Sequence, residues 1–276
     1  MDTLQSIGVA ILHGITSWIP VDESAHKLLL NYFLDWPQVS EEFNGALYLS
    51  SLLALLVFLR HDWASIISSG LRCVLTWTKP MMLDERMGFF LLLTFVPAVV
   101  AWYYAPALNL DELKSPVWIA SLLIATGLPL WFSESMNRRT KATSYWNSKD
   151  SFVLGLCQIT FLIPGVGRQA GALTAAYLLN YQKEAALKFT MLSFAPILAL
   201  NAFTGMRNLH FHDANPATDM SWMSFWVAFT VCFFTTLLTL NFLVKHAQTK
   251  RLTGAILYRC MLGAAVFGVY WFRSRG

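Results

Sequence analysis

The sequence predicts an all-α polytopic membrane protein with about six spanning helices and two re-entrant helical hairpins in inverted repeats. Three observations predict this class. Hydrophobic residues make up 56% of the chain and charged residues 13%, whereas a soluble domain averages about 25% charged residues. Several apolar runs are long enough to cross a bilayer, and one short phrase occurs twice. We predict a single membrane domain, residues 1–276, with repeat halves of approximately 1–133 and 134–276.

Six apolar runs come close to the length of about 20 residues that a spanning helix needs. In chain order they are residues 43–59, 87–110, 115–133, 189–206, 220–244 and 252–272. The first run is slightly short. The last contains Arg259, which we expect to pair with a carbonyl or carboxylate group inside the helix bundle, because a charge that faces lipid is costly.

The repeated phrase is ITSWIP at residues 15–20 and ITFLIP at residues 159–164, a constant offset of 144. Four of the six positions are identical, and each copy ends an apolar run before a small or polar stretch. The apolar runs that follow, within residues 22–35 and 170–181, are too short to cross a bilayer. Short interrupted segments at corresponding places in two halves predict re-entrant hairpins that line a site between inverted repeats.

Loop charges predict the orientation. Lys and Arg are dense in residues 60–86, 137–149 and 245–251, and sparse in the acidic stretches 105–114 and 207–219. Because cytoplasmic loops carry the excess of Lys and Arg, the first hairpin is predicted to enter from outside and the second from the cytoplasm. Arg273 and Arg275 then lie outside, against the rule. Residues 61–77 are predicted to form a helix on the cytoplasmic interface.

Composition argues against several other functions. The net charge of +4 is spread near the ends of apolar runs, so we expect no nucleic-acid partner. The four cysteines lie singly in apolar surroundings without a CxxC pair, which is typical of packing residues rather than of a disulfide or zinc site. Residues 210–213, HFHD, are interpreted as part of a solvated loop.

The first hairpin is unusually polar, because residues 13–26 read HGITSWIPVDESAH. Ionisable residues at membrane depth cost about 2.5–3.5 kcal/mol each, so they are functional candidates by default. Asp22 and Glu23 are candidate Mg²⁺ ligands or acid–base groups, and His26 is a candidate base or nucleophile. The plainer alternative places these residues at the wet mouth of a hairpin, without a function.

The second motif, PGVGRQAG at residues 164–171, is a Gly-rich turn with one Arg before a helix-compatible run. Free amides at a helix start and a guanidinium group together form an anion site suited to phosphate. The candidate phosphate-binding residues are Gly165, Gly167, Arg168 and Gln169, with Ser24 from the first motif. The two motifs are expected to bind phosphate directly, to bind it through Mg²⁺, or to act on it through His26. The apolar chain around them suggests that a lipid carries the phosphate.

At these motifs the chain resembles the undecaprenyl-pyrophosphate phosphatases, also called the bacitracin-resistance family. Their motifs read approximately E-G-x-T-E-F-[LI]-P-V-S-S-[ST]-G-H and P-G-x-S-R-S-G. The resemblance continues through residues 45–60, 184–203 and 256–272 and so covers nearly the whole chain. It implies a protein of the bacterial cytoplasmic (inner) membrane that hydrolyses undecaprenyl pyrophosphate to the monophosphate in cell-envelope lipid-carrier recycling. It also implies a divalent cation such as Mg²⁺, and a homodimer is a further expectation.

The chain departs from the family pattern at several motif positions. His13 and Ser17 stand where the family has two Glu residues, and Asp22 and Glu23 stand where it has paired Ser. Ser24, His26 and Arg168 keep the family residue types, whereas Gly167 and Gln169 replace the Ser residues beside the Arg. On a helix, a shift from position 17 to position 22 turns the side chain by roughly 140°. Direct replacement of the family carboxylates by the new acids is therefore not predicted.

Two functions follow from this pattern. In the first, the protein hydrolyses a polyprenyl pyrophosphate, with His26 as nucleophile or base, Arg168 on the phosphate, and the two acids as metal ligands or acid–base groups. In the second, the protein binds or translocates a polyprenyl phosphate without catalysis, in the manner of a flippase. A purely structural membrane subunit is a third reading, with no specific feature behind it. The first two share a polyprenyl pyrophosphate or phosphate ligand.

Overall fold

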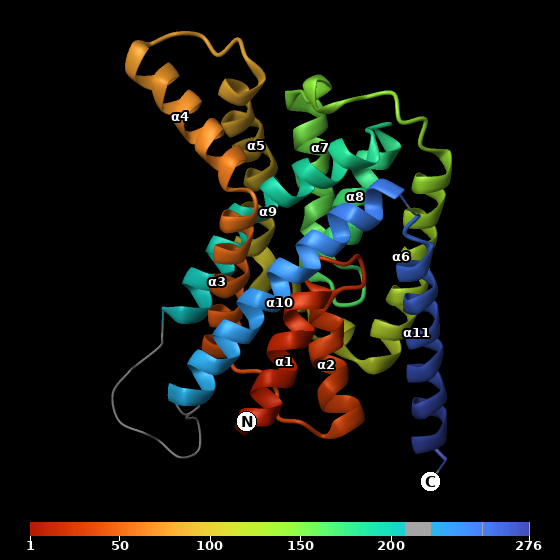
Figure 1. Cartoon of the computed structure of the whole chain (residues 1–276). Helices are drawn as coiled ribbons and strands as arrows, with labels where there is room; N and C mark the ends of the chain where they lie inside the picture. Colours follow the sequence, from red (N-terminus) through yellow and green to blue (C-terminus); the bar gives the residue numbers. More distant parts are fainter. Residues whose placement is uncertain (208–221, 250, 276) are drawn as a thin grey trace.

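The computed structural model describes residues 1–207, 222–249 and 251–275 (Figure 1). Its α-helices are α1 (Thr3–Thr16), α2 (Glu23–Leu34), α3 (Glu41–Phe58), α4 (Arg60–Thr76), α5 (Leu83–Tyr104), α6 (Pro116–Met136), α7 (Ser148–Gln158), α8 (Arg168–Leu178), α9 (Lys183–Met206), α10 (Trp222–Thr249) and α11 (Thr253–Arg273). Short 3₁₀ helices are η1 (Ala105–Leu108), η2 (Leu110–Lys114), η3 (Thr143–Tyr145) and η4 (Ile159–Leu162). The described residues contain no β-strand, and a single bridge joins Lys141 to Tyr181. The predicted all-α class is confirmed.

The described residues include six helices long and apolar enough to span a membrane: Glu41–Phe58, Leu83–Leu108, Pro116–Met136, Lys183–Met206, Met223–His246 and Thr253–Arg273. They correspond to the six predicted runs. The fourth helix begins six residues before the predicted run 189–206, because Lys183 and Lys188 belong to its first turns. A search for charge-free runs misses such turns, since a Lys stem packs on apolar surface while its ammonium reaches water. The predicted loop at 210–213 lies outside the described residues.

Side-chain caps fix where several helices begin. Asp2, Ser40, Ser115 and Asn147 each accept a hydrogen bond from a first-turn amide, of α1, α3, α6 and α7 respectively. A cap of this kind satisfies an amide that has no partner within the helix. The polar residues that interrupt the apolar runs therefore set the helix boundaries.

Helix α4 projects from the end of the bundle at which α3 ends and α5 begins (Figure 1). It matches the segment predicted at 61–77. Ile66 is its one residue classed as buried, whereas Ile67, Leu71, Val74 and Leu75 are exposed. An exposed apolar face of this kind suits the membrane interface, and the location of α4 on that interface stays a prediction.

Two hairpins of short helices enter the bundle from opposite ends, and their loops meet in the middle (Figure 1). Helices α1, α2, α7 and α8 have 14, 12, 11 and 11 residues. At 1.5 Å per residue they are shorter than the hydrocarbon core of about 30 Å. Shifting α2 by the repeat offset of 144 gives residues 167–178, one residue from the start of α8. How the hairpins sit in a bilayer stays a prediction.

Helices from the first half of the chain pack mainly on helices from the second half, and the contacts come in matching pairs. Helix α1 of the first hairpin packs on α10, and α7 of the second hairpin packs on α5. Helix α3 packs on α9, and α6 packs on α11. Each hairpin is thus held by a spanning helix from the other half of the chain. The second set of helices begins after α6 ends at Met136, and the division into halves at residues 133 and 134 stays a prediction.

A cluster around Asp150 holds the base of the second hairpin. Its Oδ2 atom accepts hydrogen bonds from Lys141 Nζ at 2.9 Å, Asn147 Nδ2 at 2.9 Å and the Tyr181 hydroxyl at 2.6 Å. The ring of Trp146 stacks on Tyr181 with ring centres 3.8 Å apart. These contacts join the chain before α7 to the chain after α8, so the two ends of the hairpin stay together.

Arg259 in α11 joins the two hairpin loops, and its side chain is fully buried. Its five hydrogen bonds reach the carbonyl oxygens of Leu123 (3.1 Å), Pro20 (3.1 Å), Val166 (3.2 Å) and Gly165 (2.6 Å) and the Thr126 hydroxyl. Pro20 lies in the first loop, and Gly165 and Val166 lie in the second. The predicted pairing of Arg259 with carbonyl groups is therefore confirmed.

We expect Arg259→Lys to lower the melting temperature of the purified protein in detergent. A Lys side chain cannot reach both loops, so several carbonyl groups lose partners, at about 1–3 kcal/mol for each buried group. Arg138→Lys is the matched control, because Arg138 is exposed. An Arg259→Lys protein as stable as this control would show that the loops are held by other contacts.

The crossing of α3 and α9 predicts a second effect. A Cβ atom on Gly45 would lie 2.9 Å from the Gly205 backbone, whereas a Cβ on Gly268 would meet nothing within 4 Å. Gly45→Ala should therefore destabilise the protein by about 1–3 kcal/mol through overpacking, while Gly268→Ala should be neutral or stabilising by up to about 1 kcal/mol. Thermal unfolding of both variants in one detergent tests this, and equal melting temperatures would contradict it.

Candidate functional site

Asp22 forms the turn that ends the first loop. It has a φ of 73°, and its side chain caps α2 by accepting from the Ala25 amide at 3.0 Å. The same Oδ2 atom accepts from the Gly165 amide at 2.6 Å. Ser24 Oγ donates to the Asp22 carboxylate at 3.0 and 3.1 Å. Asp22 thus connects the first hairpin directly to the second loop.

The second loop needs glycine at two positions. Gly165 and Gly167 have φ values of 94° and 81°, a region that favours glycine. A Cβ on Gly167 would also lie 2.9 Å from Asp22 Cβ, so only a glycine lets the two loops approach this closely. Helix α8 starts at Arg168 with no side-chain cap. A small pocket at this point is lined by Thr16, Ser17, Ile19, Asp22, Glu23, Gly167, Arg168 and Gln169.

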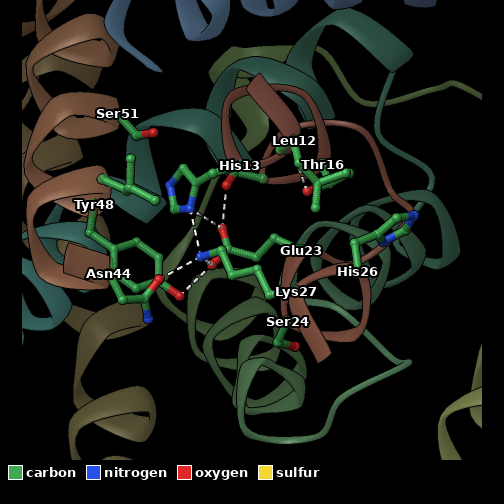
Figure 2. A network of polar contacts seen from close by, with 12 residues as sticks. Leu12, His13, Thr16, Glu23, Ser24, His26, Lys27, Asn44, Tyr48 and Ser51 are labelled. Carbon is green, nitrogen blue, oxygen red and sulfur yellow. Dashed lines mark hydrogen bonds and ion pairs between the residues drawn. The ribbon is translucent and has the colours of Figure 1, made fainter. Parts of the chain in front are cut away.

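Glu23 lies at the centre of the polar network in Figure 2. Its Oε2 atom accepts from the Ser17 hydroxyl and from Arg168 Nη2 at 3.3 Å. Its Oε1 atom accepts from the Tyr48 hydroxyl and from Lys27 Nζ at 3.2 Å. The residue is 7% exposed, so its carboxylate is buried. Both carboxylate oxygens accept hydrogen bonds from the donors named above. A buried charge needs such partners to offset its loss of hydration.

The position of Glu23 corrects one sequence inference. Positions 17 to 22 do not belong to one helix, because α1 ends at Thr16 and α2 starts at Glu23. The loop between them reverses the chain and returns Glu23 to the Ser17 hydroxyl and to within 3.7 Å of His13 Nδ1. The carboxylate therefore lies beside Ser17 and His13, the two positions at which the resemblance implies Glu.

Several buried polar atoms around the pocket have no protein partner. They are Arg168 Nε, both side-chain amide atoms of Gln169, and His13 Nε2. The Arg168 guanidinium lies 5.3 Å from the Phe194 ring centre and 5.7 Å from that of Tyr48. Leaving a buried polar group unpaired costs about 1–3 kcal/mol. The unpaired donors Arg168 Nε and Gln169 Nε2 lie at the uncapped start of α8, which is suited to an anionic ligand.

His26 belongs to a different cluster. Its Nδ1 atom contacts the Asp22 carbonyl oxygen at 2.5 Å, and its Nε2 atom contacts the Tyr258 hydroxyl at 2.8 Å. Its ring also stacks on Tyr258, with centres 5.6 Å apart. Figure 2 shows the ring turned away from Glu23. The fold therefore does not bring His26 together with Glu23, and its predicted role as base or nucleophile stays a prediction.

The predicted phosphate-binding residues divide into two groups. Gly167, Arg168 and Gln169 line the pocket. The Ser24 hydroxyl and the Gly165 amide instead donate to Asp22, so both donors serve the junction between the loops. His13 and Ser17, the other motif residues, both reach the network, through Lys27 and Glu23 respectively.

Sequence reasoning missed three residues of the site: Lys27, Asn44 and Tyr48. Lys27 Nζ lies 2.7 Å from His13 Nδ1 and 2.5 Å from Asn44 Oδ1. Lys27 had a usable signal, since it is an ionisable residue within a hairpin expected at membrane depth. Asn44 and Tyr48 had none, because their position depends on how α3 packs beside the hairpin.

These residues do not fit a Mg²⁺ ion held by Asp22 and Glu23. The carboxylate oxygens of both residues already accept hydrogen bonds from protein donors. The cationic groups of Lys27 and Arg168 also face Glu23. The part of the chain that the structure describes contains no cluster of three or more His, Cys, Asp or Glu side chains arranged for a metal.

The fold and site together define a polytopic helical membrane protein with an anion-receptive site where two hairpin loops meet. The chain belongs to the family described as bacitracin resistance protein BacA, whose profile matches residues 6–265. It is 28% identical over 273 residues to an undecaprenyl-diphosphatase of Moorella thermoacetica, covering 99% of this chain and 100% of that protein. It is 27% identical over 271 residues to an undecaprenyl-diphosphatase of Alcanivorax borkumensis, covering 98% and 99%.

Variants of Asp22 test whether its side chain stabilises the protein by capping α2 and by accepting from the Gly165 amide. Asp22→Asn should keep the melting temperature near that of the parent, because one side-chain oxygen still accepts from both amides and Asn tolerates positive φ. Asp22→Ala loses the cap, at about 0.5–2 kcal/mol, and also leaves the Gly165 amide unpaired. Ser115→Ala, which removes only the cap of α6, is the control and should cost less than Asp22→Ala. Equal losses for Asp22→Asn and Asp22→Ala would contradict this.

Proposed function

We propose that the protein hydrolyses undecaprenyl pyrophosphate to undecaprenyl phosphate and inorganic phosphate. The observation that carries the proposal is the buried pair of Glu23 and Arg168, 3.3 Å apart, at the junction of the two hairpins. It joins a carboxylate and a guanidinium group at an uncapped helix start. Membership of the family and the names of the two relatives support the same reaction.

Arg168 binds the terminal phosphate in this proposal. A guanidinium group makes paired hydrogen bonds to phosphate oxygens, and the Arg168 Nε atom has no protein partner. The amide groups at the start of α8 and the Gln169 side chain add further donors. In this proposal, binding also draws the Arg168 Nη2 atom from the Glu23 carboxylate to the phosphate.

Glu23 is the proposed general base. Once Arg168 turns to the phosphate, one Glu23 oxygen becomes available to a water molecule. The water oxygen bonds to the terminal phosphorus while the bond from phosphorus to the bridging oxygen breaks. The electron pair of that bond stays on undecaprenyl phosphate, and the water proton moves to Glu23. Arg168 stabilises the negative charge that develops in the transition state.

His26 has a positioning part in this proposal. Its ring connects the Asp22 carbonyl oxygen to Tyr258 and so supports the turn before Glu23. The reaction belongs to lipid-carrier recycling in the bacterial cytoplasmic membrane. The six helices able to span a membrane and the substrate's long apolar tail suit that setting.

The test is phosphate release from undecaprenyl pyrophosphate by purified protein in detergent. Glu23→Gln should lower kcat by about 10²–10⁴-fold, the range for loss of a general base. Arg168→Lys should lower kcat/KM, because a single ammonium does not replace a guanidinium fork. His26→Ala should have a smaller effect on kcat than Glu23→Gln. The matched controls Glu184→Gln and Arg138→Lys change exposed residues and should behave as the parent.

One alternative outcome has its own meaning. Binding of the lipid that depends on Arg168, with no phosphate release from the parent protein, would overturn the hydrolase proposal. The protein would then be a non-catalytic binder or translocase of polyprenyl phosphate. Equal activity of Glu23→Gln and the parent would instead remove Glu23 from the chemistry while leaving the reaction in place.

A further inference from the structure

The side chain of Lys27 lies at the meeting point of three helices and is only 9% exposed. Its ammonium group contacts Asn44 Oδ1 of α3 at 2.5 Å, His13 Nδ1 of α1 at 2.7 Å and Glu23 Oε1 of α2 at 3.2 Å. An ammonium has three N–H donors, and these three acceptors match them in number. Figure 2 shows the three acceptors gathered around this group.

These acceptors are an imidazole nitrogen, a carboxylate oxygen and an amide oxygen, which are atom types that proteins use to bind divalent cations. The distances from Lys27 Nζ to these acceptors are 2.5–3.2 Å, which are the lengths of hydrogen bonds. The ammonium thus occupies a place that is built like a cation site.

Lys27 also sets the state of His13. Because an ammonium only donates, His13 Nδ1 must accept, and the proton of the neutral ring lies on Nε2. A metal ion bound to one ring nitrogen fixes the tautomer in the same way. Lys27 therefore fixes the tautomer of His13, and it is one of four groups that hold Glu23, with Ser17, Tyr48 and Arg168.

The local charges favour an ammonium over a metal ion. Glu23 is the single carboxylate that the two cations of Lys27 and Arg168 contact here, so this group of three carries one net positive charge. A divalent ion added beside them would meet two positive charges and only one negative one. A pyrophosphate group, by contrast, is attracted to the excess positive charge.

We propose that the Lys27 ammonium is the resident cation of this site, and that it takes the place and the charge-neutralising task of a divalent metal ion. Hydrolysis by this chain is then independent of divalent metal. The test by phosphate release rests on the proposed function, whereas the test by Mn²⁺ binding does not. Lys27 acts through Glu23 and His13 and is a positioning residue.

Three measurements on the intact protein test this. The parent should release phosphate in excess EDTA at a rate within about twofold of its rate in Mg²⁺, since the cation is part of the chain. Lys27→Ala removes the ammonium and opens the space, so in EDTA its rate should fall by about 100-fold and Mn²⁺ should restore at least about tenfold. Lys27→Met removes the charge but fills the same space, so Mn²⁺ should not restore the rate of phosphate release in this variant.

Electron paramagnetic resonance of Mn²⁺ gives a readout that does not need activity. Lys27→Ala should bind Mn²⁺ tightly, and the added substitution Glu23→Gln should abolish this binding. The parent, Lys27→Met and the exposed-residue control Lys149→Ala should bind none tightly. If Lys27 has only a structural role, Lys27→Ala and Lys27→Met should lose the same fraction of the phosphate-release rate, and Mn²⁺ should rescue neither. That result would overturn the proposal.

The outcomes separate the two proposals. Phosphate release by the parent that EDTA abolishes and Mg²⁺ restores would overturn the part assigned to Lys27 and leave the hydrolase intact. No release by the parent under any condition would end the hydrolase proposal. In that case, Mn²⁺ binding would still test the resident-cation proposal. Tight binding of Mn²⁺ by the parent that Glu23→Gln abolishes would overturn this proposal as well. Tight binding of Mn²⁺ by Lys27→Ala alone would support it.

Discussion

The guanidinium group of Arg259 holds the two loops from which the site is built. Each loop ends a helix in the middle of the bundle, where backbone carbonyl groups have lost their helical partners. Arg259 donates to the carbonyl oxygens of Pro20, Gly165 and Val166. Once these loops are together, the Asp22 carboxylate reaches the Gly165 amide. Glu23 directly follows Asp22, and Arg168 lies three residues after Gly165, so the two side chains meet as a consequence.

A second constraint is the burial of charge. Glu23 is stable inside the bundle because Lys27 and Arg168 lie against it and Ser17 and Tyr48 donate to it. Removing one partner of a buried ion pair is strongly destabilising, so these groups form one unit. The unit has an excess of positive charge, and several donors near it have no protein partner. The same arrangement that keeps the carboxylate buried therefore prepares the site for an anion.

Much of the fold was predictable because it follows from composition and length. The six spanning helices follow from apolar runs of sufficient length, and the paired hairpins follow from the repeated phrase and the short runs after it. The pairing of Arg259 with carbonyl groups followed from the cost of a lipid-facing charge. The inference that neither acid takes up a place near position 17 was wrong for Glu23, because it extended a helix through residues 17–22, where the chain reverses. Lys27 was missed although the rule for ionisable residues applied to it.

The sequence by itself determined the helices, the hairpins and the set of polar residues, since hydropathy, helix capping and glycine positions act locally along the chain. Tertiary structure alone decided which of these polar residues share a site. Asn44 reaches Lys27 and Tyr48 reaches Glu23 only because α3 packs beside the first hairpin. His26 faces Tyr258 only because α11 passes on its other side. Contacts between segments distant in the chain depend on packing, and a local pattern carries no signal of it.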